Sequence, residues 1–209
     1  MKEQPITEKE SLDIITSMIE STKQRLHLGD GNILLLWGYL TVGVAMLITL
    51  LLLLTHNAVW NWLWFLIWII GGIVTPHMMK KQQNKAGVRT YTDKLSSGIW
   101  SLVGANAILF TFLCLGFMLF AGKDIWSLMP VFALLVVGIV ETVQGMIIKE
   151  KTLIAGGSIG MVAGAVTTAL IVADIPLYLG WFMPMFVVAW ICMMIIPGHY
   201  LNAKARRQK

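Results

Sequence analysis

The feature that most constrains this chain is a series of six long apolar runs. At a rise of about 1.5 Å per residue, runs of about 21 to 25 residues cross the roughly 30 Å hydrocarbon core of a bilayer as helices. Because lipid offers no hydrogen-bond partner to an open backbone, such runs span as helices. We therefore predict an all-α membrane protein with six transmembrane helices. They lie at approximately 33–55, 59–79, 98–121, 125–148, 152–173 and 177–201.

The composition supports a membrane protein. Only 13% of the 209 residues are charged, against about 25% in ordinary soluble domains. The net charge of +5 comes from basic residues beside the apolar runs, where they fix orientation, so we expect the lipid bilayer and no nucleic acid as a partner. Cys114 and Cys192 both lie in apolar runs without a CxxC pair, which argues against a disulfide framework or a zinc site.

The distribution of basic residues predicts the orientation. With six spans both termini share one side, and of the 16 Lys and Arg residues only Lys123 falls on the opposite side. The positive-inside rule makes the basic side cytoplasmic. We predict a multi-pass protein of a bacterial-type inner (plasma) membrane with both termini cytoplasmic. The basic residues on that side are Lys2, Lys9, Lys23, Arg25, Lys80, Lys81, Lys85, Arg89, Lys94, Lys149, Lys151, Lys204, Arg206, Arg207 and Lys209.

The loops on the outer side are very short. They comprise 56–58, 122–124 and 174–176. Short connections favour antiparallel neighbours. We therefore expect three tight hairpins, made by spans one and two, three and four, and five and six.

The segment 1–31 precedes the membrane domain, which covers 32–201, and a basic cytoplasmic tail follows at 202–209. Thr7 and Glu10 have the spacing of a capping box, which predicts a helix start. Apolar residues then recur at helical spacing, which indicates an amphipathic cytoplasmic helix. They are Leu12, Ile14, Ile15, Met18, Ile19 and Leu26.

This helix has two interpretations. It can lie on the membrane surface, or residues 7–28 can dock against protein. That protein is a partner, another copy of the chain, or the chain's own basic loop between the second and third spans. Interfacial helices are usually rich in Lys and Arg on the polar side. Here acidic residues such as Asp13 and Glu20 outnumber the basic ones, so we favour docking against protein.

Glu141 is the only acidic residue deep inside an apolar run. A carboxyl group in hydrocarbon is costly, so it marks a candidate functional site. Gln144 lies one turn further on the same helical face. Asn106 enters the membrane from the same side at a matching depth of about 12 Å, so the three side chains form a candidate polar site.

Two interpretations of this site are open. In the functional one, Glu141, Gln144 and Asn106 serve a proton, a cation or an amine substrate. In the structural one, Glu141 is kept neutral by desolvation and makes a hydrogen bond between helices. No cationic side chain shares the depth of Glu141, so we do not expect an ion pair.

Gly156, Gly160 and Gly164 stand four residues apart on one face of the fifth span. Such a row of small residues lets another helix approach closely. The partner can belong to this chain or to another subunit. We favour this chain, because five other helices need burial.

A metal site is the weaker interpretation of the His and Met residues near the ends of spans two and six. His77 and His199 each follow a proline, and several methionines lie nearby, which would suit a soft metal such as Cu(I). Consecutive methionines such as Met193 and Met194 point in different directions on a helix, however. We therefore predict no metal site and no cofactor.

The chain lacks the motifs of known enzyme classes. No HExxH, GxSxG or Walker A motif occurs, so we predict no catalytic residue and no enzyme activity. The sequence favours a non-catalytic regulatory, sensing or scaffold component that acts through its N-terminal helix and basic loop. The alternative is a small transporter or channel-like protein that uses Glu141.

Overall fold

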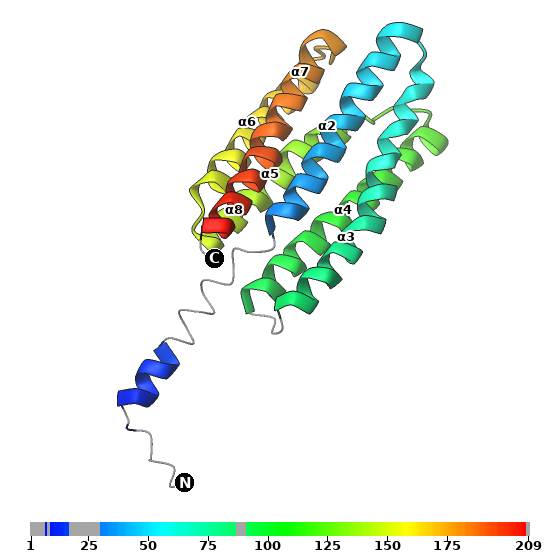
Figure 1. The fold of residues 1–209 in the computed structure, drawn as a ribbon. Helices are drawn as coiled ribbons and strands as arrows, with labels where there is room; N and C mark the ends of the chain where they lie inside the picture. The colour runs from blue at the N-terminus through cyan, green and yellow to red at the C-terminus, as the bar shows by residue number, and fades with distance from the viewer. Residues whose placement is uncertain (1–6, 8, 17–29, 87–90, 208–209) are drawn as a thin grey trace.

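The computed structural model describes residue 7 and residues 9–16, 30–86 and 91–207, and this part of the chain is all α (Figure 1). The expected residues 17–28 of the N-terminal helix, Arg89 of the basic loop and Lys209 of the tail lie outside the described residues. The long elements follow in chain order. They are α2 (Asp30–Thr55), η2 (Ala58–Trp64), α3 (Phe65–Ala86), α4 (Tyr91–Ala121), α5 (Leu128–Ile148), α6 (Lys151–Val172), α7 (Leu179–Trp190), η3 (Ile191–Ile195) and α8 (Ile196–Arg207).

Six of these helical segments are long and apolar enough to cross a membrane, which confirms the predicted number. The second segment joins the 3₁₀ helix η2 to α3, and the sixth joins α7, the π-helical turn η3 and α8. The observed bounds lie close to the predicted ones, and helices extend beyond the apolar runs at several ends. The segments are Gly31–Thr55, Ala58–Lys81, Lys94–Ala121, Leu128–Ile148, Lys151–Val172 and Leu179–Arg207.

The most extensive helix pair is α5 with α6. The two helices are joined by Lys149 and Glu150 alone. Lys149 adopts a left-handed conformation with φ 58°, and the Glu150 N–H donates to the carbonyl of Gly145 at 2.8 Å, which ends α5 in a Schellman motif. None of the three expected hairpins contains this pair, and the pairing of the spans into those hairpins stays a prediction.

Glycines explain why α5 and α6 lie so close. A Cβ atom on Gly157 of α6 would lie 2.5 Å from the carbonyl oxygen of Gly138 of α5. A Cβ atom on Gly145 would lie 2.8 Å from the backbone nitrogen of Ile154. Only residues without side chains allow two backbones to meet at these distances.

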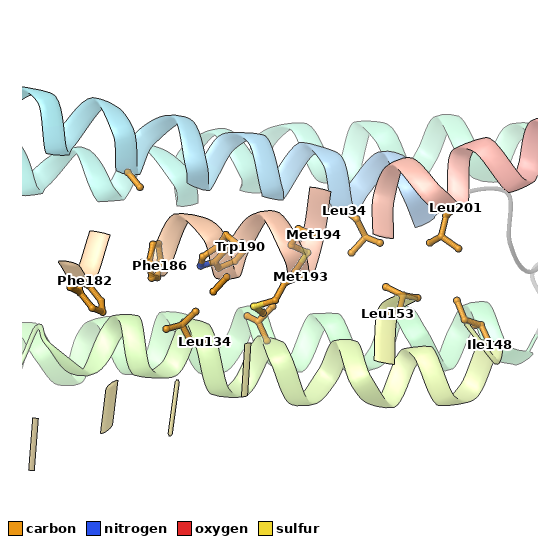
Figure 2. Packing of buried hydrophobic residues seen from close by; sticks show 13 residues of the cluster. Leu34, Leu134, Ile148, Leu153, Phe182, Phe186, Trp190, Met193, Met194 and Leu201 are labelled. Carbon is orange, nitrogen blue, oxygen red and sulfur yellow. The ribbon is translucent and has the colours of Figure 1, made fainter. Parts of the chain in front are cut away.

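The core is built around the last span. Figure 2 shows that Phe186, Trp190 and Met193 lie between α2 on one side and the α5–α6 pair on the other. The buried cluster is apolar and draws on α2, α5, α6, α7, η3 and α8. Its labelled members are Leu34, Leu134, Ile148, Leu153, Phe182, Phe186, Trp190, Met193, Met194 and Leu201.

Helices α3 and α4 lie outside this core. Only 6% of the apolar window of the second span and 11% of that of the third are buried, against 50% for α5. The second span is tied to α2 by the indole Nε1 of Trp37, which donates to Thr75 Oγ1 at 3.1 Å. The apolar faces of α3 and α4 are therefore largely exposed, as side chains facing lipid would be.

The predicted capping box at the start of the N-terminal helix is confirmed. The Thr7 N–H donates to Glu10 Oε2 at 2.9 Å, and the Glu10 N–H donates to Thr7 Oγ1 at 3.3 Å. The bonds from the Thr7 backbone and side chain hold the pKa of Glu10 below its ordinary value. Residues 9–16 are helical, so the sequence sets this helix start through purely local contacts.

Candidate functional site

Glu141 lies on α5 and its side chain is completely buried. Its carboxyl oxygen Oε1 is 3.3 Å from the position that a Cβ atom of Gly156 would occupy. The carbonyl oxygen of Cys192 is 2.6 Å from the same position. The Glu141 carboxyl group therefore reaches the place where α5, α6 and η3 meet.

Neither carboxyl oxygen of Glu141 has a hydrogen-bond partner within the described part of the chain. Burying a polar group without a partner costs roughly 1–3 kcal/mol, and more when it carries a charge. The structural interpretation of Glu141 requires a hydrogen bond between helices, and no described residue provides the partner for one. The group is buried at a cost that packing alone does not explain.

Gln144 is buried one turn further along α5. Its Oε1 accepts a hydrogen bond from the indole Nε1 of Trp100 on α4. A residue of the third span therefore contacts the polar face of α5, as expected, but that residue is Trp100 and not Asn106. The sequence offered no signal for this choice beyond the position of Trp100 near the start of its span.

Asn106 does not join this group. Its side chain is exposed, and its Nδ2 donates to the carbonyl of Leu102 in the same helix at 2.8 Å. Of the three residues in the predicted polar site, the structure buries Glu141 and Gln144 on one helix. It turns the amide of Asn106 toward its own backbone.

The turn η3 opposite Glu141 has a physical origin in Pro197. A proline inside a helix clashes with the carbonyl four residues before it and supplies no N–H. Widening to a π turn relieves such a clash, and π turns occur frequently at functional sites. The Ile196 N–H accordingly donates to the carbonyl of Ile191, in the i to i+5 pattern.

The glycine row of α6 packs within this chain. Gly156 faces the backbone of Cys192 and Met193, and a Cβ atom on Gly160 would lie 2.7 Å from the methyl carbon of Met193. A Cβ atom on Gly164 would instead lie 2.6 Å from Leu135 of α5. The glycine row thus allows close packing of α6 against two elements, η3 and α5.

The two histidines named in the sequence lie on different helices and have separate partners. His77 Nδ1 is 2.8 Å from the carbonyl of Ile73 in its own helix, and His199 Nε2 is 2.7 Å from the hydroxyl of Tyr39. Within residues 7, 9–16, 30–86 and 91–207, no group of three or more His, Cys, Asp or Glu side chains is placed to hold a metal ion.

Polar contacts that the sequence did not reveal tie the beginning of α2 and the α5–α6 turn to α8. The buried carboxylate of Glu150 forms an ion pair with Lys204, and Asn202 Nδ2 donates to Asn32 Oδ1 at 2.8 Å. The partners in the second bond are 170 residues apart. Periodicity within one helix carries no information about such distant pairs.

No protein-family model, curated protein or solved structure matches this chain.

Proposed function

We propose that this chain is a non-catalytic component of a bacterial-type inner membrane, with six spans and both termini in the cytoplasm. In this proposal it binds a protein partner through its N-terminal helix and through the basic loop between α3 and α4. The observation that carries the proposal is an apolar pair on the capped helix, Leu12 and Ile15, whose side chains are 63% and 52% exposed.

Several features support partner binding over membrane-surface binding. The Thr7–Glu10 capping box fixes the start of the helix, which lowers the entropy lost when a partner docks. Glu10 and Asp13 place acidic charge beside the apolar pair. Acidic charge is repelled by the anionic lipids of a cytoplasmic leaflet, whereas it suits a basic rim around an apolar groove.

Replacing Leu12 or Ile15 with aspartate should abolish partner binding. The expected result is the loss of a stoichiometric partner that co-purifies with the full-length protein from native membranes. Thr16→Asp is the matched control, because it adds the same charge to an exposed position of the same helix and should leave the partner bound. Equal retention of the partner by all three variants would exclude this helix as the docking element.

The proposed orientation predicts a labelling pattern. In a chain whose two native cysteines are replaced by alanine, a cysteine at position 57 should react with a membrane-impermeant maleimide on intact cells. A cysteine at position 80 should react only after permeabilisation, because it lies on the basic side of the span. The opposite pattern would invert the topology and remove the N-terminal helix from the cytoplasm.

A second candidate function is a small transporter or channel-like protein that uses Glu141. The observation that favours it is the buried carboxyl group without a partner, because intramembrane ionisable groups mark ion and proton pathways. Purified protein in vesicles should then carry a flux of protons or cations that Glu141→Gln abolishes. Absence of flux in the unmodified protein would exclude this candidate and leave the first one standing.

A further inference from the structure

Tyr39 of α2 and His199 of α8 form a polar pair on the outer surface of the bundle. The Tyr39 hydroxyl lies 2.7 Å from His199 Nε2, and the two rings meet edge-on. Both residues are exposed, although they belong to membrane-spanning segments. Ionisable residues in such segments almost always face the bundle interior or a water-filled cavity. A histidine that faces outward therefore needs polar groups from the surrounding bilayer.

The pair lies near the boundary between the hydrocarbon core and the lipid headgroups. The last segment, Leu179–Arg207, has 29 residues. As a helix it is about 43 Å long, which matches the thickness of a bilayer with its headgroup layers. A core of about 20 residues, counted from the interfacial residue Trp181, ends near Leu201. His199 thus lies just inside the boundary and Arg206 just outside it, at the level of the phosphate groups.

His199, Ala203 and Arg206 share one exposed face of α8. Ala203 and Arg206 follow His199 by four and seven residues, which places the three in line over two helical turns. A long side chain on a helix leans toward the turn that precedes it. The Arg206 side chain can therefore extend back over Ala203, whose small exposed side chain leaves the surface between Arg206 and His199 accessible to a headgroup.

The charge of this surface favours an anion. The last turn of α8 contains Lys204, Arg206 and Arg207, and the helix has no acidic residue. Lys204 is paired with the buried Glu150, whereas both arginines are exposed. The only charged residue of α2 is Asp30, at its first position, so the two arginines keep the surface positive. A zwitterionic lipid would also bring an ammonium group, for which α8 offers no carboxylate. The surface therefore suits an anionic headgroup better.

The hydrogen bond between Tyr39 and His199 prepares the imidazole for a phosphate. When the Tyr39 hydroxyl donates to Nε2, the neutral ring carries its proton on Nδ1, which is then a hydrogen-bond donor. Along α2, the exposed face continues from Tyr39 through Gly43, Met46 and Leu50, at spacings of four, three and four residues. This apolar face can take up an acyl chain of a lipid whose phosphate lies at His199.

We propose that Tyr39, His199 and Arg206 form a binding site for the phosphate of an anionic diacyl phospholipid. The Arg206 guanidinium pairs with one phosphate oxygen, His199 Nδ1 donates to another, and an acyl chain lies along α2. The bound lipid bridges the first and last spans where α2 packs against α8 (Figure 1). The inference is independent of both candidate functions, because it uses neither the N-terminal helix nor Glu141.

The test is native mass spectrometry of the purified full-length protein in detergent, titrated with phosphatidylglycerol or with phosphatidylcholine of the same acyl chains. We expect one phosphatidylglycerol per chain to bind at least about tenfold more tightly than phosphatidylcholine. Arg206→Gln removes the guanidinium, and Tyr39→Phe removes only the hydroxyl. Each should weaken phosphatidylglycerol binding by about fivefold. Both positions are exposed, so the variants should fold.

Lys123→Gln and Tyr178→Phe are the matched controls, since they make the same kinds of change at exposed positions near the opposite end of the bundle. Both should bind phosphatidylglycerol as the unmodified protein does. Equal binding of the two lipids by the unmodified protein overturns the proposal, and so does equal phosphatidylglycerol binding by Arg206→Gln, Tyr39→Phe and the controls. A disulfide between two chains that carry Ala203→Cys, formed in native membranes after the native cysteines are replaced by alanine, would also overturn it, because a second copy would then cover this face.

Discussion

Replacing Gly157 with alanine should destabilise the protein by about 3 kcal/mol or more, seen as a large fall in Tm by circular dichroism of the purified protein. The added methyl group would lie 2.5 Å from the Gly138 carbonyl oxygen and 2.7 Å from the Thr142 backbone nitrogen. Both atoms belong to the backbone of α5 and cannot rotate aside. The two helices would have to separate along the most extensive contact of the bundle.

Two other glycines provide the controls for this prediction. Gly104→Ala introduces a methyl group with no described atom within 4 Å, so stability should be unchanged or slightly higher through helix propensity. Gly160→Ala should fall between the two, because its nearest neighbour is the flexible side chain of Met193. Equal Tm values for Gly157→Ala and Gly104→Ala would show that α5 and α6 are not held at this distance.

Replacing Glu141 with methionine should raise the stability of the protein, by about 1–3 kcal/mol, measured by thermal unfolding of the purified protein. Methionine has a similar length and removes two buried oxygens that have no hydrogen-bond partner among the described residues. Even a buried ion pair can often be replaced by apolar residues of similar volume with no loss or a gain of stability, and a buried carboxyl group without a partner has less to lose. A gain in stability is the expected sign of a group kept for function.

Gln144→Met is the matched control on the same face of α5. It removes the acceptor of the Trp100 indole N–H and should therefore destabilise the protein, by roughly 1–2 kcal/mol. The two substitutions lie one turn apart and are expected to have opposite signs. If Glu141→Met were as destabilising as Gln144→Met, Glu141 would have a structural partner and the functional interpretation would lose its basis.

The six helices and the capping box were predictable because both depend on short stretches of sequence. The length and apolarity of a run decide that it forms a membrane-spanning helix. The cap depends on Thr7 and Glu10, which are three residues apart. In both cases the residues that carry the signal also make the contacts.

The neighbours of the polar residues were not predictable. The position of Asn106 and Glu141 within their apolar runs predicts their depth in the membrane, but it does not predict the rotation of their helices about the helix axes. In soluble helices an apolar stripe gives that rotation, whereas nearly all positions of α4 and α5 in the membrane region are apolar. The structure accordingly turns Asn106 outward and brings Trp100 to Gln144.

The closeness of α5 and α6 was not predicted for a related reason. Short outer loops suggested three hairpins, but the turn at Lys149 and Glu150 is as short as the outer turn at His56 and Asn57, and glycines on both helices let the backbones meet. Gly138 and Gly157 allow this close approach, but the prediction considered only the four-residue spacing of Gly156, Gly160 and Gly164, which lies on one face of the helix. Pro197 indicated a distortion of the last span, but Pro76 and Pro184 lie inside α-helical segments, so a proline alone did not predict the π turn.

The packing of α2 against α7, η3 and α8 has a consequence for how the protein is made. The first span is synthesised before the others, whereas α7, η3 and α8, against which it packs, follow all the other described helices in the chain. Asn32 and Asn202, which form a hydrogen bond, are separated by 170 residues. At synthesis rates of about 5–20 residues per second, α8 is therefore completed roughly ten to thirty seconds after the start of α2. During that interval the membrane insertion machinery or lipid has to cover a surface of α2 that is buried in the finished fold, so the bundle can close only once α8 has been synthesised.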